Sequence, residues 1–435
     1  MLRGKKAAFY TLGCKLNFSE TSTISRQLTD LGFSKAEFNE GADVFVINTC
    51  SVTENANREC RRIIRKAKKI SPSSTVIVTG CYAQLKPEAI SCIDGVDMVV
   101  GANEKFNIPS LLKKFISQTP EIHGCSINNL NYFSSYSLHD RTRSFLKIQD
   151  GCDYPCTYCT IPLARGKSRS DTISNIVKNA EEIAKNGIKE IVLTGVNIGD
   201  FKQEEMRFID LIKQLDQING IERYRISSIE PNLITDEIID FVKDSKKFMP
   251  HFHIPLQSGS DNVLKMMKRR YNTKLYFEKI KKIQKAIPNV CIGADVIVGF
   301  PEETDLEFNK TLNFIKDLKI SYLHVFSYSE RENTKAILLD NKVDKQKRVE
   351  RSKMLRILSS KLQRLFYKRF ENTQQKVLFE KDNKDGFVYG FTENYIKIKI
   401  PFDNNLVKNS TNVLLNEIDE NLIMNAQINE LCIQQ

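Results

Sequence analysis

Apolar runs and amphipathic segments alternate along the first part of the chain. Four apolar runs read AAFYT, DVFVIN, TVIVTG and VDMVVG. Each is followed by a segment whose apolar positions recur with helical spacing, at residues 17–32, 53–70, 84–92 and 108–116. The alternation predicts a parallel sheet covered by helices. We expect this N-terminal α/β domain to occupy residues 1–120, and a polar, irregular linker to follow over 121–143.

The same alternation resumes after the linker. Apolar strands are predicted near 145–148, 190–193, 223–227, 251–254, 290–297 and 322–326. Helical stretches lie between them at 174–186, 206–217, 235–244, 273–286 and 304–317. Successive strand-helix units of this kind predict a partial, open (βα)6 barrel over residues 144–335.

The last quarter of the chain changes pattern twice. A long helix is predicted over 344–370, with leucines on one stripe, within a basic segment at 336–371. Residues 331–376 hold 14 Lys and Arg against 5 Asp and Glu, so much of the excess positive charge lies here. Short runs such as GFVYGFT and YIKIKIP, separated by turn residues, then predict a small β module over 372–435.

Composition narrows the class of protein. At roughly 150 residues per domain, 435 residues make about three domains, and 41% hydrophobic residues are enough to build their cores. No apolar run approaches the ~18 residues that span a bilayer, and no apolar signal segment follows Met1, so we expect a cytoplasmic protein. The net charge of +12 favours a nucleic-acid partner, although moderately basic enzymes are common.

One cysteine motif has the spacing of a metal centre. Cys152, Cys156 and Cys159, here called the motif triad, follow a predicted strand. The chain has 11 cysteines, and an odd number with three so close together suits a metal site better than a disulfide framework. A cubane of four irons and four sulfides held by three thiolates leaves one iron open to a ligand with an amine and a carboxylate. Zinc is the alternative, but no fourth Cys or His ligand lies close by in the sequence.

Three more cysteines, here called the strand-end triad, close predicted strands of the first domain. They are Cys14, Cys50 and Cys81. Parallel strands bring their carboxyl ends to one edge of a sheet, so these thiols can converge. A single strand-end cysteine is more often a small buried hydrophobe, but three of three favour a second site, with Asn17 and Asn48 as candidate hydrogen-bond partners. The remaining cysteines are interpreted as packing or exposed thiols: Cys60, Cys92, Cys125, Cys291 and Cys432.

These motifs resemble those of a known superfamily. CxxxCxxC with Tyr158 before its third cysteine resembles the radical S-adenosylmethionine (SAM) enzymes. The likeness narrows to the methylthiotransferases and covers nearly the whole chain, through TLGCKLN at 11–17, LTGVN at 193–197, SSIEP at 227–231, HIPLQSGSDNVLKMMKR at 253–269 and GADVIVGFPEET at 293–304. The resemblance implies a partial barrel for the central domain, a TRAM-like RNA-binding β module, and a [4Fe-4S] cluster at each triad.

The resemblance also implies a set of cofactor-binding residues. Barrel enzymes bind ligands at the carboxyl ends of their strands. At these ends the resemblance implies contacts with SAM from Tyr158, Gly195, Asn197, Ser228, Glu230, Gln257, Ser258, Asp295 and Gly299. A satisfied cap, or a glycine needed for packing, is the alternative for any one of them.

The activity that the resemblance implies is methylthiolation of an unactivated carbon. Two SAM molecules are used per turnover. One is cleaved reductively at the motif triad to give a 5'-deoxyadenosyl radical, and the other donates a methyl group to sulfur at the strand-end triad. An electron donor such as flavodoxin or ferredoxin is implied as a partner.

The residues after the first cysteine indicate the substrate class. Lys15 and Leu16 resemble the enzymes that act on N6-threonylcarbamoyladenosine at position 37 of tRNA. The enzymes for isopentenyladenosine-37 tend to Gln-Met here, and those for a ribosomal protein to Pro-Lys, and both remain alternatives. A non-catalytic iron-sulfur protein that binds RNA is a more distant alternative, because it gives the SAM-binding segments no purpose.

Basic and aromatic residues supply candidate tRNA contacts. Arg165 and Arg169 follow the motif triad and could meet a substrate phosphate. Arg331 lies in YSERENTKA, which departs from the Pro- and Gly-containing form of the family. A charged surface in solvent is the alternative for each of them. In the β module, Lys397 lies among residues suited to phosphate contact and base stacking, namely Tyr389, Phe391, Tyr395 and Lys399.

Overall fold

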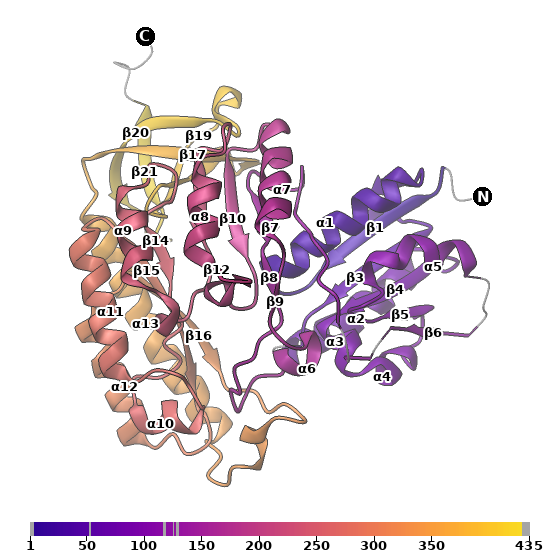
Figure 1. The fold of residues 1–435 in the computed structure, drawn as a ribbon, viewed down its shortest axis with the longest axis horizontal. Helices are drawn as coiled ribbons and strands as arrows, with labels where there is room; N and C mark the ends of the chain where they lie inside the picture. Colours follow the sequence, from indigo (N-terminus) through magenta and orange to yellow (C-terminus); the bar gives the residue numbers. More distant parts are fainter. Residues whose placement is uncertain (1–3, 52–53, 116–118, 125, 128–129, 429–435) are drawn as a thin grey trace.

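The computed structural model describes residues 4–51, 54–115, 119–124, 126–127 and 130–428 (Figure 1). This part of the chain forms an N-terminal parallel sheet, a central set of parallel strands with helices, and a C-terminal β barrel. Cys125 and Cys432 lie outside the described residues, as do residues 53 and 116 at the ends of two predicted helices. No helix of the described chain is both long and apolar enough to cross a membrane.

The N-terminal sheet is wholly parallel, with strand order β2-β1-β3-β4-β5-β6. Its strands are β1 (Lys6–Thr11), β2 (Ser34–Ala36), β3 (Val44–Thr49), β4 (Thr75–Gly80), β5 (Met98–Val100) and β6 (Glu121–His123). Its helices are α1 (Lys15–Asp30), α2 (Glu54–Ile70), α3 (Cys81–Leu85), α4 (Pro87–Ser91) and α5 (Ile108–Lys114). Apolar residues of α1 and α5 pack on one face and those of α2 and α4 on the other, which confirms the predicted layered arrangement.

Two details of this sheet differ from the sequence pattern. The edge strands β2 and β6 read SKA and EIH, and three residues without an apolar run give no strand signal. The segment 84–92, predicted as one helix, is divided, because Pro87 has no N–H to continue a helix and instead starts α4.

Six parallel strands form the central domain as two three-stranded sheets. They are β7 (Ser144–Lys147), β10 (Glu190–Thr194), β13 (Arg223–Ile226), β14 (His251–His253), β15 (Cys291–Val298) and β16 (Tyr322–Ser327). Parallel bridges from Tyr224 to Phe248 and from Ser228 to His253 join the two sheets. The long helices are α7 (Ile173–Lys185), α8 (Phe208–Asp216), α9 (Asp236–Asp244), α11 (Thr273–Ala286) and α12 (Asp305–Leu318). The predicted partial (βα)6 barrel is confirmed.

Shorter elements complete the chain. The antiparallel pairs are β8 (Gln149–Asp150) with β9 (Arg169–Ser170) and β11 (Lys202–Gln203) with β12 (Met206–Arg207), and the short helices are α6 (Ile161–Arg165) and α10 (Asp261–Met266). Turns of 3-10 helix span Phe38–Glu40, Lys105–Asn107, Ile198–Asp200, Pro231–Leu233, Lys335–Leu338 and Asn404–Leu406.

The two faces of the central strands differ in chemistry. Alternate residues of a strand face opposite ways. On one face, residues such as Leu146, Ile191, Tyr224 and Ala294 join a single core with the helices. The other face, here called the polar face, carries Lys147, Glu190, Arg223, Arg225, His251, His253, Asp295, Tyr322 and His324. So many polar groups on an inner strand face indicate a binding surface rather than a packed core.

The chain ends in a long helix and a closed barrel. The helix is α13 (Lys345–Lys368), and the barrel strands, in the order β17-β18-β19-β21-β20, are β17 (Gln374–Lys384), β18 (Phe387–Thr392), β19 (Lys397–Pro401), β20 (Ser410–Ile418) and β21 (Met424–Ile428). The predicted β module is confirmed, and β21 adds a strand, MNAQI, that is too short and polar to stand out in the sequence.

The C-terminal barrel docks on the amino end of β13. Arg223, 1% exposed, donates to the carbonyl oxygens of Phe391 at 2.9 Å and Lys376 at 3.0 Å. Arg225, 2% exposed, donates to those of Glu393 and Thr392, each at 2.8 Å. Two buried guanidinium groups therefore depend on the C-terminal barrel for hydrogen bonds.

Candidate active site

The strand-end triad lies at the carboxyl edge of the N-terminal sheet. Cys14 is the N-cap of α1, Cys50 directly follows β3, and Cys81 is the first residue of α3. The strands β1, β3 and β4 are neighbours, and the chain passes from one side of β1 to the other between β2 and β3. Ligands of parallel sheets bind outside the carboxyl ends of the strands beside such a reversal.

Glycine next to a cysteine lets the strand ends approach. Gly13 has φ +104°, and a Cβ there would lie 2.8 Å from the Cβ of Cys50. Gly80 has φ +98°, and a Cβ there would clash with the Oδ1 of Asn48. Only glycine adopts this left-handed conformation without strain, so the two turns that carry Cys14 and Cys81 depend on it.

The thiols of this edge influence one another. Cys14 is exposed and Cys81 is buried, and neither is in a disulfide. Desolvation raises the pKa of Cys14, Arg165 opposes this, and the nearby Cys81 raises the pKa further. Such thiols become thiolates readily only when a cation is bound between them, which is the chemistry of a metal ligand set.

Asn17 and Asn48 are used by the protein itself. The Nδ2 of Asn17 donates to the carbonyl oxygens of Leu12 at 2.8 Å and Thr49 at 3.0 Å, which ties the ends of β1 and β3 together. The Nδ2 of Asn48 donates to the carbonyl oxygen of Asn17 at 3.1 Å. Asn48 Oδ1 is buried without a partner among the described residues. Both amides position the triad, and a contact with a cluster sulfide stays a prediction.

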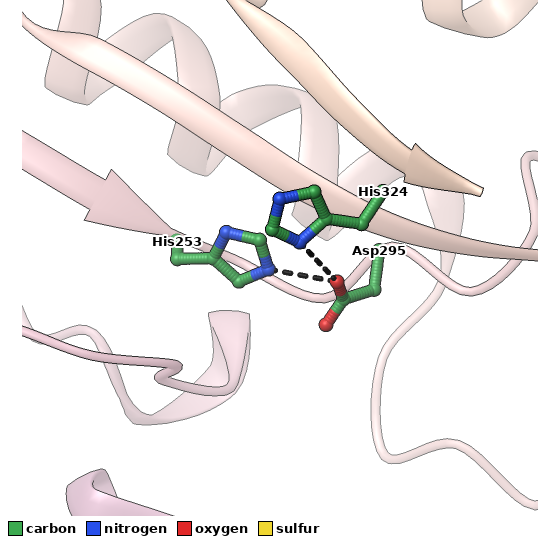
Figure 2. Close-up of side chains that lie close together, drawn as sticks. All are labelled: His253, Asp295 and His324. Atoms are coloured by element: carbon green, nitrogen blue, oxygen red, sulfur yellow. Dashed lines mark hydrogen bonds and ion pairs between the residues drawn. The ribbon is translucent and has the colours of Figure 1, made fainter. Parts of the chain in front are cut away.

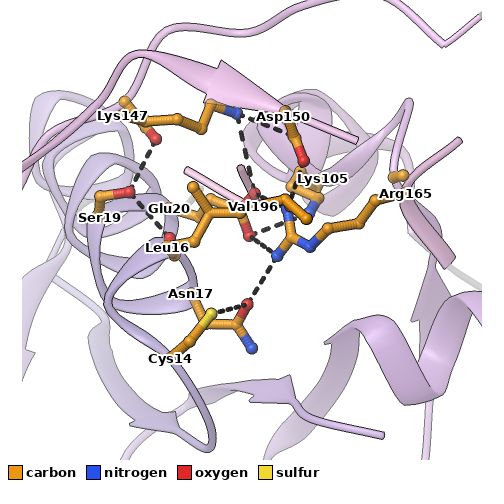
Figure 3. A network of polar contacts seen from close by, with 12 residues as sticks. Cys14, Leu16, Asn17, Ser19, Glu20, Lys105, Lys147, Asp150, Arg165 and Val196 are labelled. Carbon is orange, nitrogen blue, oxygen red and sulfur yellow. Dashed lines mark hydrogen bonds and ion pairs between the residues drawn. The ribbon is translucent and has the colours of Figure 1, made fainter. Parts of the chain in front are cut away.

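A buried ion network joins this edge to the central domain (Figure 3). Arg165 Nη1 lies 2.9 Å from Glu20 and 3.0 Å from Asp150. Lys105 Nζ lies 3.0 Å from Glu20, and Lys147 Nζ lies 3.3 Å from Asp150. None of these five side chains is more than 6% exposed. The two domains are therefore held together by ion pairs that water does not screen.

The carboxylates of this network are ionised at neutral pH. Burial alone would raise the pKa of Glu20, but Arg165, Lys105 and Lys147 outweigh it and lower the pKa to about 2. Desolvation is likewise overcome at Asp150, whose pKa is held well below its ordinary value, first of all by Arg165. The stabilisation therefore depends on charges that persist over the whole physiological range of pH.

The motif triad lies on the loop between β8 and α6. The backbone N–H groups of Tyr154 and Ile161 donate to the Sγ atoms of Cys152 and Cys159, each at 3.4 Å. Burial raises the pKa of Cys152 to about 11 and that of Cys159 to about 12, and the nearby Cys156 raises both. Mutually interacting thiols with N–H donors to sulfur suit the ligands of a cluster.

Both triads lie at one domain interface. The helix α6 follows the motif triad in the chain, and α3 begins with Cys81 of the strand-end triad. These two helices pack against each other. Groups held at the two triads would therefore meet across this interface.

Arg269 connects the motif triad to two residues expected to bind SAM. Its Nη1 donates to Cys156 Sγ at 3.0 Å and lies 3.4 Å from the Oη of Tyr158. Its Nη2 pairs with the carboxylate of Glu230. The ring of Tyr158 meets that of Phe300 edge-on, with centroids 6.4 Å apart. The fold thus brings Tyr158 and Glu230 to the motif triad, while their contact with SAM stays a prediction.

Two buried amides at strand ends have polar atoms without partners. Asn197, 4% exposed, follows β10, and neither Nδ2 nor Oδ1 has a partner among the described residues. Gln257 has φ +64°, and its buried Oε1 has none in the described chain either. Gln149, which the sequence did not single out, accepts from the backbone N–H of Asn197 at 2.9 Å and so positions it. Unpaired buried amides are costly, so each of these strand ends suits a polar ligand such as SAM.

The other expected cofactor residues have local structural roles. A Cβ at Gly195 would lie 2.9 Å from the carbonyl oxygen of Gln149. Ser258 Oγ bonds Thr311 Oγ1 at 3.1 Å, and Ser228 forms the bridge between β13 and β14. Gly299 has φ +74°, which its turn requires. These roles account for the residue types without a ligand, so their contact with SAM stays a prediction.

Asp295 lies among two histidines on the polar face (Figure 2). Its Oδ1 is 2.8 Å from His253 Nε2 and 3.4 Å from His324 Nδ1. Desolvation is overcome by these imidazoles, which hold the pKa of Asp295 well below its ordinary value. The sequence analysis did not single out His253 or His324. The strands HFH and YLH alternate polar with apolar residues, and this alternation could have indicated a polar face.

The arginines expected to contact RNA are bound to protein groups. Arg165 belongs to the buried network, and Arg169 donates to Asp150 at 3.3 Å and to backbone carbonyl oxygens. Arg331, 8% exposed, donates to the carbonyl oxygen of Ser51 at 2.9 Å and so holds the chain beside Cys50. Arg165 and Arg331 therefore join the central domain to the N-terminal domain, whereas Arg169 bonds Asp150 and nearby carbonyl oxygens. A phosphate contact of any of the three stays a prediction.

The aromatic residues of the C-terminal barrel divide into two groups. Tyr395 stacks on His251, with centroids 4.4 Å apart, and on Phe391 at 4.9 Å, so both face the central domain. Lys397 Nζ lies 5.0 Å from the ring centroid of Tyr389 and is half-buried. Of the residues expected to contact RNA, Tyr395 and Phe391 are thus occupied by contacts near the central domain, whereas Tyr389 and Lys397 contact each other within the barrel.

Comparison with known proteins gives a consistent result. Residues 146–315 match the radical SAM superfamily, and residues 6–101 match the uncharacterized protein family UPF0004. The chain is 39% identical to threonylcarbamoyladenosine tRNA methylthiotransferase MtaB of Bacillus subtilis (strain 168), over 90% of this chain and 89% of that one. The protein of the same name from Aquifex aeolicus (strain VF5) is 36% identical over 91% and 96% of the two chains. A tRNA-2-methylthio-N(6)-dimethylallyladenosine synthase of Thermodesulfovibrio yellowstonii is 31% identical over 92% and 94%.

Solved structures with a similar fold are more distant in sequence. The radical S-adenosylmethionine methyltransferase TsrM from Kitasatospora setae, solved with cobalamin and a [4Fe-4S] cluster bound, has a TM-score of 0.57 and 12% identity over 76% of this chain and 74% of that one. At this identity the likeness supports the fold alone.

Proposed function

The chain belongs to the radical SAM tRNA methylthiotransferases that act on threonylcarbamoyladenosine, and we propose that it carries out this reaction with two [4Fe-4S] clusters, one at each cysteine triad. It converts N6-threonylcarbamoyladenosine at position 37 of tRNA to the 2-methylthio derivative by radical SAM chemistry. The observation that supports the two-cluster proposal is the presence of two sets of three cysteines, one at the strand ends of the N-terminal sheet and one on the loop between β8 and α6, on opposite sides of one domain interface.

The proposed ligands follow from the chemistry of the donors. Three thiols in each triad would hold one cluster and leave one iron without a protein ligand. At the motif triad this iron would take SAM, and the unpaired amides of Asn197 and Gln257 suit its polar groups. When bound, the reduced cluster supplies the electron that cleaves SAM and so provides the radical that activates the C–H bond.

The residues of the chain have three tasks in this proposal. Gln149 holds the turn that carries Asn197, because its side-chain Oε1 accepts from the backbone N–H groups of Val196 and Asn197, each at 2.9 Å. Arg269 donates to Cys156 and so favours the thiolate form that a cluster requires. The buried network of Glu20 and Arg165 fixes the distance between the two triads, which matters because a small displacement of reacting groups slows a reaction severely.

We also propose the partners and setting that the chemistry requires. Cleavage of SAM consumes an electron, so an electron donor such as flavodoxin or ferredoxin must dock on the chain. The substrate is a cellular tRNA, which supports a cytoplasmic location. The net charge of +12 and the placement of Lys397 and Tyr389 support tRNA contact through the C-terminal barrel.

Nucleoside mass spectrometry tests this function. Expression of the chain in bacteria that lack their own enzyme for threonylcarbamoyladenosine should restore 2-methylthio-N6-threonylcarbamoyladenosine, and the Cys50→Ala and Cys156→Ala variants should not. A matched strain that lacks the enzyme for isopentenyladenosine should not be rescued. Rescue of the second strain alone would reassign the substrate.

A further inference from the structure

Three side chains of metal-binding type meet on the polar face, apart from both cysteine triads. His253, Asp295 and His324 come from the adjacent strands β14, β15 and β16 (Figure 2). Their side chains are 11%, 22% and 57% exposed, so the cluster opens to solvent at His324. Two imidazoles and one carboxylate are the protein ligands of known catalytic zinc and iron sites. The cluster therefore has the donor atoms of a metal site that solvent can reach.

The strand register brings these side chains together. Asp295 lies directly opposite His324, and His253 lies opposite Gly293, which is two residues before Asp295 and on the same face of β15. A Cβ at Gly293 would clash with the ring of Tyr322, so glycine lets this ring lie across β15. Regular strands hold all three donors, and a site on strands is positioned more precisely than a site on loops.

The distances between the donor atoms suit a single ion. Asp295 Oδ1 lies 2.8 Å from His253 Nε2 and 3.4 Å from His324 Nδ1. One donor atom from each of the three residues lies within 4.8 Å of the other two. Two ligand atoms of a tetrahedral ion, each ~2.1 Å from it, are about 3.4 Å apart. Small rotations of the imidazoles would therefore place all three donors around one ion.

Tyr322 supplies the outer contact that a metal-binding histidine needs. Its Oη lies 3.3 Å from His253 Nδ1, the ring nitrogen that does not contact Asp295. A histidine that binds a metal through one nitrogen almost always donates its other N–H to a neighbouring group, which fixes the tautomer and the ring orientation. With its Nδ1 proton donated to Tyr322, His253 presents the lone pair of Nε2 to the site.

We infer that His253, Asp295 and His324 bind one divalent transition-metal ion such as zinc, in addition to the clusters proposed at the two cysteine triads. The ligands are imidazole and carboxylate rather than thiolate, so the site takes a single ion and not an iron-sulfur cluster. Three protein ligands leave a fourth position for an oxygen ligand such as water or a carboxylate, as in catalytic zinc sites. The inference gives Asp295 a different ligand from the SAM that the family resemblance implies.

The competing arrangement is a carboxylate that is hydrogen-bonded by the two imidazoles without any ion. Zinc binding by the cluster-loaded full-length protein distinguishes the two. The anaerobically reconstituted enzyme is equilibrated with zinc chloride in a chelator buffer that fixes the free zinc concentration, and zinc and iron are counted in the same sample by mass spectrometry. The wild type should bind about one zinc per chain, because one ion satisfies the three ligands.

Three variants show where the zinc is bound. His324→Ala removes the exposed ligand and should weaken zinc binding at least about 100-fold, because loss of an outer contact alone costs about 10–100-fold. Tyr322→Phe keeps the ring and removes the outer contact, so its loss should fall within that smaller range. His139→Asn is the matched control. It replaces another exposed histidine, at a φ of +64° that asparagine tolerates, and should bind zinc as the wild type does.

Cobalt(II) in place of zinc identifies the ligand type. Thiolate ligands give cobalt an intense charge-transfer absorption, whereas imidazole and carboxylate give only weak ligand-field bands. Weak bands in the wild type that are lost in His324→Ala support the site. The inference is overturned if no zinc is bound, if His324→Ala binds zinc as tightly as the wild type, or if thiolate absorption accounts for all the bound cobalt. The proposed function stands in each of these cases, because the iron count and methylthiolation are measured independently of zinc.

Discussion

Replacement of Arg165 by methionine should weaken the contact between the N-terminal and central domains. Arg165 is 3% exposed and pairs with Glu20 at 2.9 Å and Asp150 at 3.0 Å. Methionine keeps the apolar stem but leaves both carboxylates with one cation fewer. The loss of a buried partner costs about 3–5 kcal/mol, because the remaining charge stays desolvated.

Because cations remain beside both carboxylates, we expect a loss of stability for Arg165→Met at the low end of that range. Glu20 keeps Lys105, and Asp150 keeps Lys147. We therefore expect a loss of about 3 kcal/mol in the free energy of unfolding, or roughly 6–12 °C in melting temperature. Thermal unfolding of the cluster-loaded protein by circular dichroism measures it, with midpoints compared between variants because a multidomain chain need not unfold in two states.

Two further variants make this prediction refutable. Arg62→Met removes a surface ion pair between Arg62 and Glu59. The Arg62 side chain is 62% exposed, so this variant should leave the midpoint of thermal unfolding almost unchanged. Glu20→Gln in the Arg165→Met background should recover part of the loss, because the unpaired buried charge is removed. A midpoint for Arg165→Met equal to that of Arg62→Met, with no recovery in the double variant, would refute the role assigned to the network.

Three other predictions follow from the same structure. The anaerobically reconstituted protein should hold about eight irons per chain, and Cys50→Ala and Cys156→Ala should each lose about half by iron analysis. Because the pKa of Glu20 falls from 4.5 to about 2 on folding, its charge stabilises the protein above pH 4.5, and this stability is lost as the pH falls toward 2, so urea unfolding of Glu20→Gln should depend less on pH in that range. Deletion of 372–435 leaves Arg225 without its carbonyl acceptors, so calorimetry should find a lower melting temperature for the central domain.

The strands and cysteine triads could be predicted because their signals are local. An apolar run such as TVIVTG predicts β4, and the cysteine that follows it is at the sheet edge whatever the rest of the chain does. The spacing of the motif triad is likewise complete within one loop. In contrast, β2 consists of only SKA, which has no strand pattern of its own. It is a strand because it pairs with β1, and that pairing could not be predicted from the three residues.

The partners of charged residues could not be predicted because they are distant in sequence. Arg165 lies in a basic stretch of the sequence, and that composition suggests a phosphate contact. Its partner Glu20 is 145 residues away, on a helix of another domain. Tyr395 stacks on His251 for the same kind of reason, since only the docking of the C-terminal barrel brings the rings together. Which face of an element is covered by another domain is a property of the assembled chain.

The most direct test of the two-cluster account separates the tasks of the two triads in one assay. The reconstituted enzyme is given a chemical reductant, SAM and an anticodon stem-loop with threonylcarbamoyladenosine, and both 5'-deoxyadenosine and the methylthiolated nucleoside are measured by mass spectrometry. We expect Cys156→Ala to form neither product, and Cys50→Ala to form 5'-deoxyadenosine without any methylthiolated nucleoside. Methylthiolation by Cys50→Ala at the wild-type rate would contradict the account, because the strand-end triad would then have no part in the reaction.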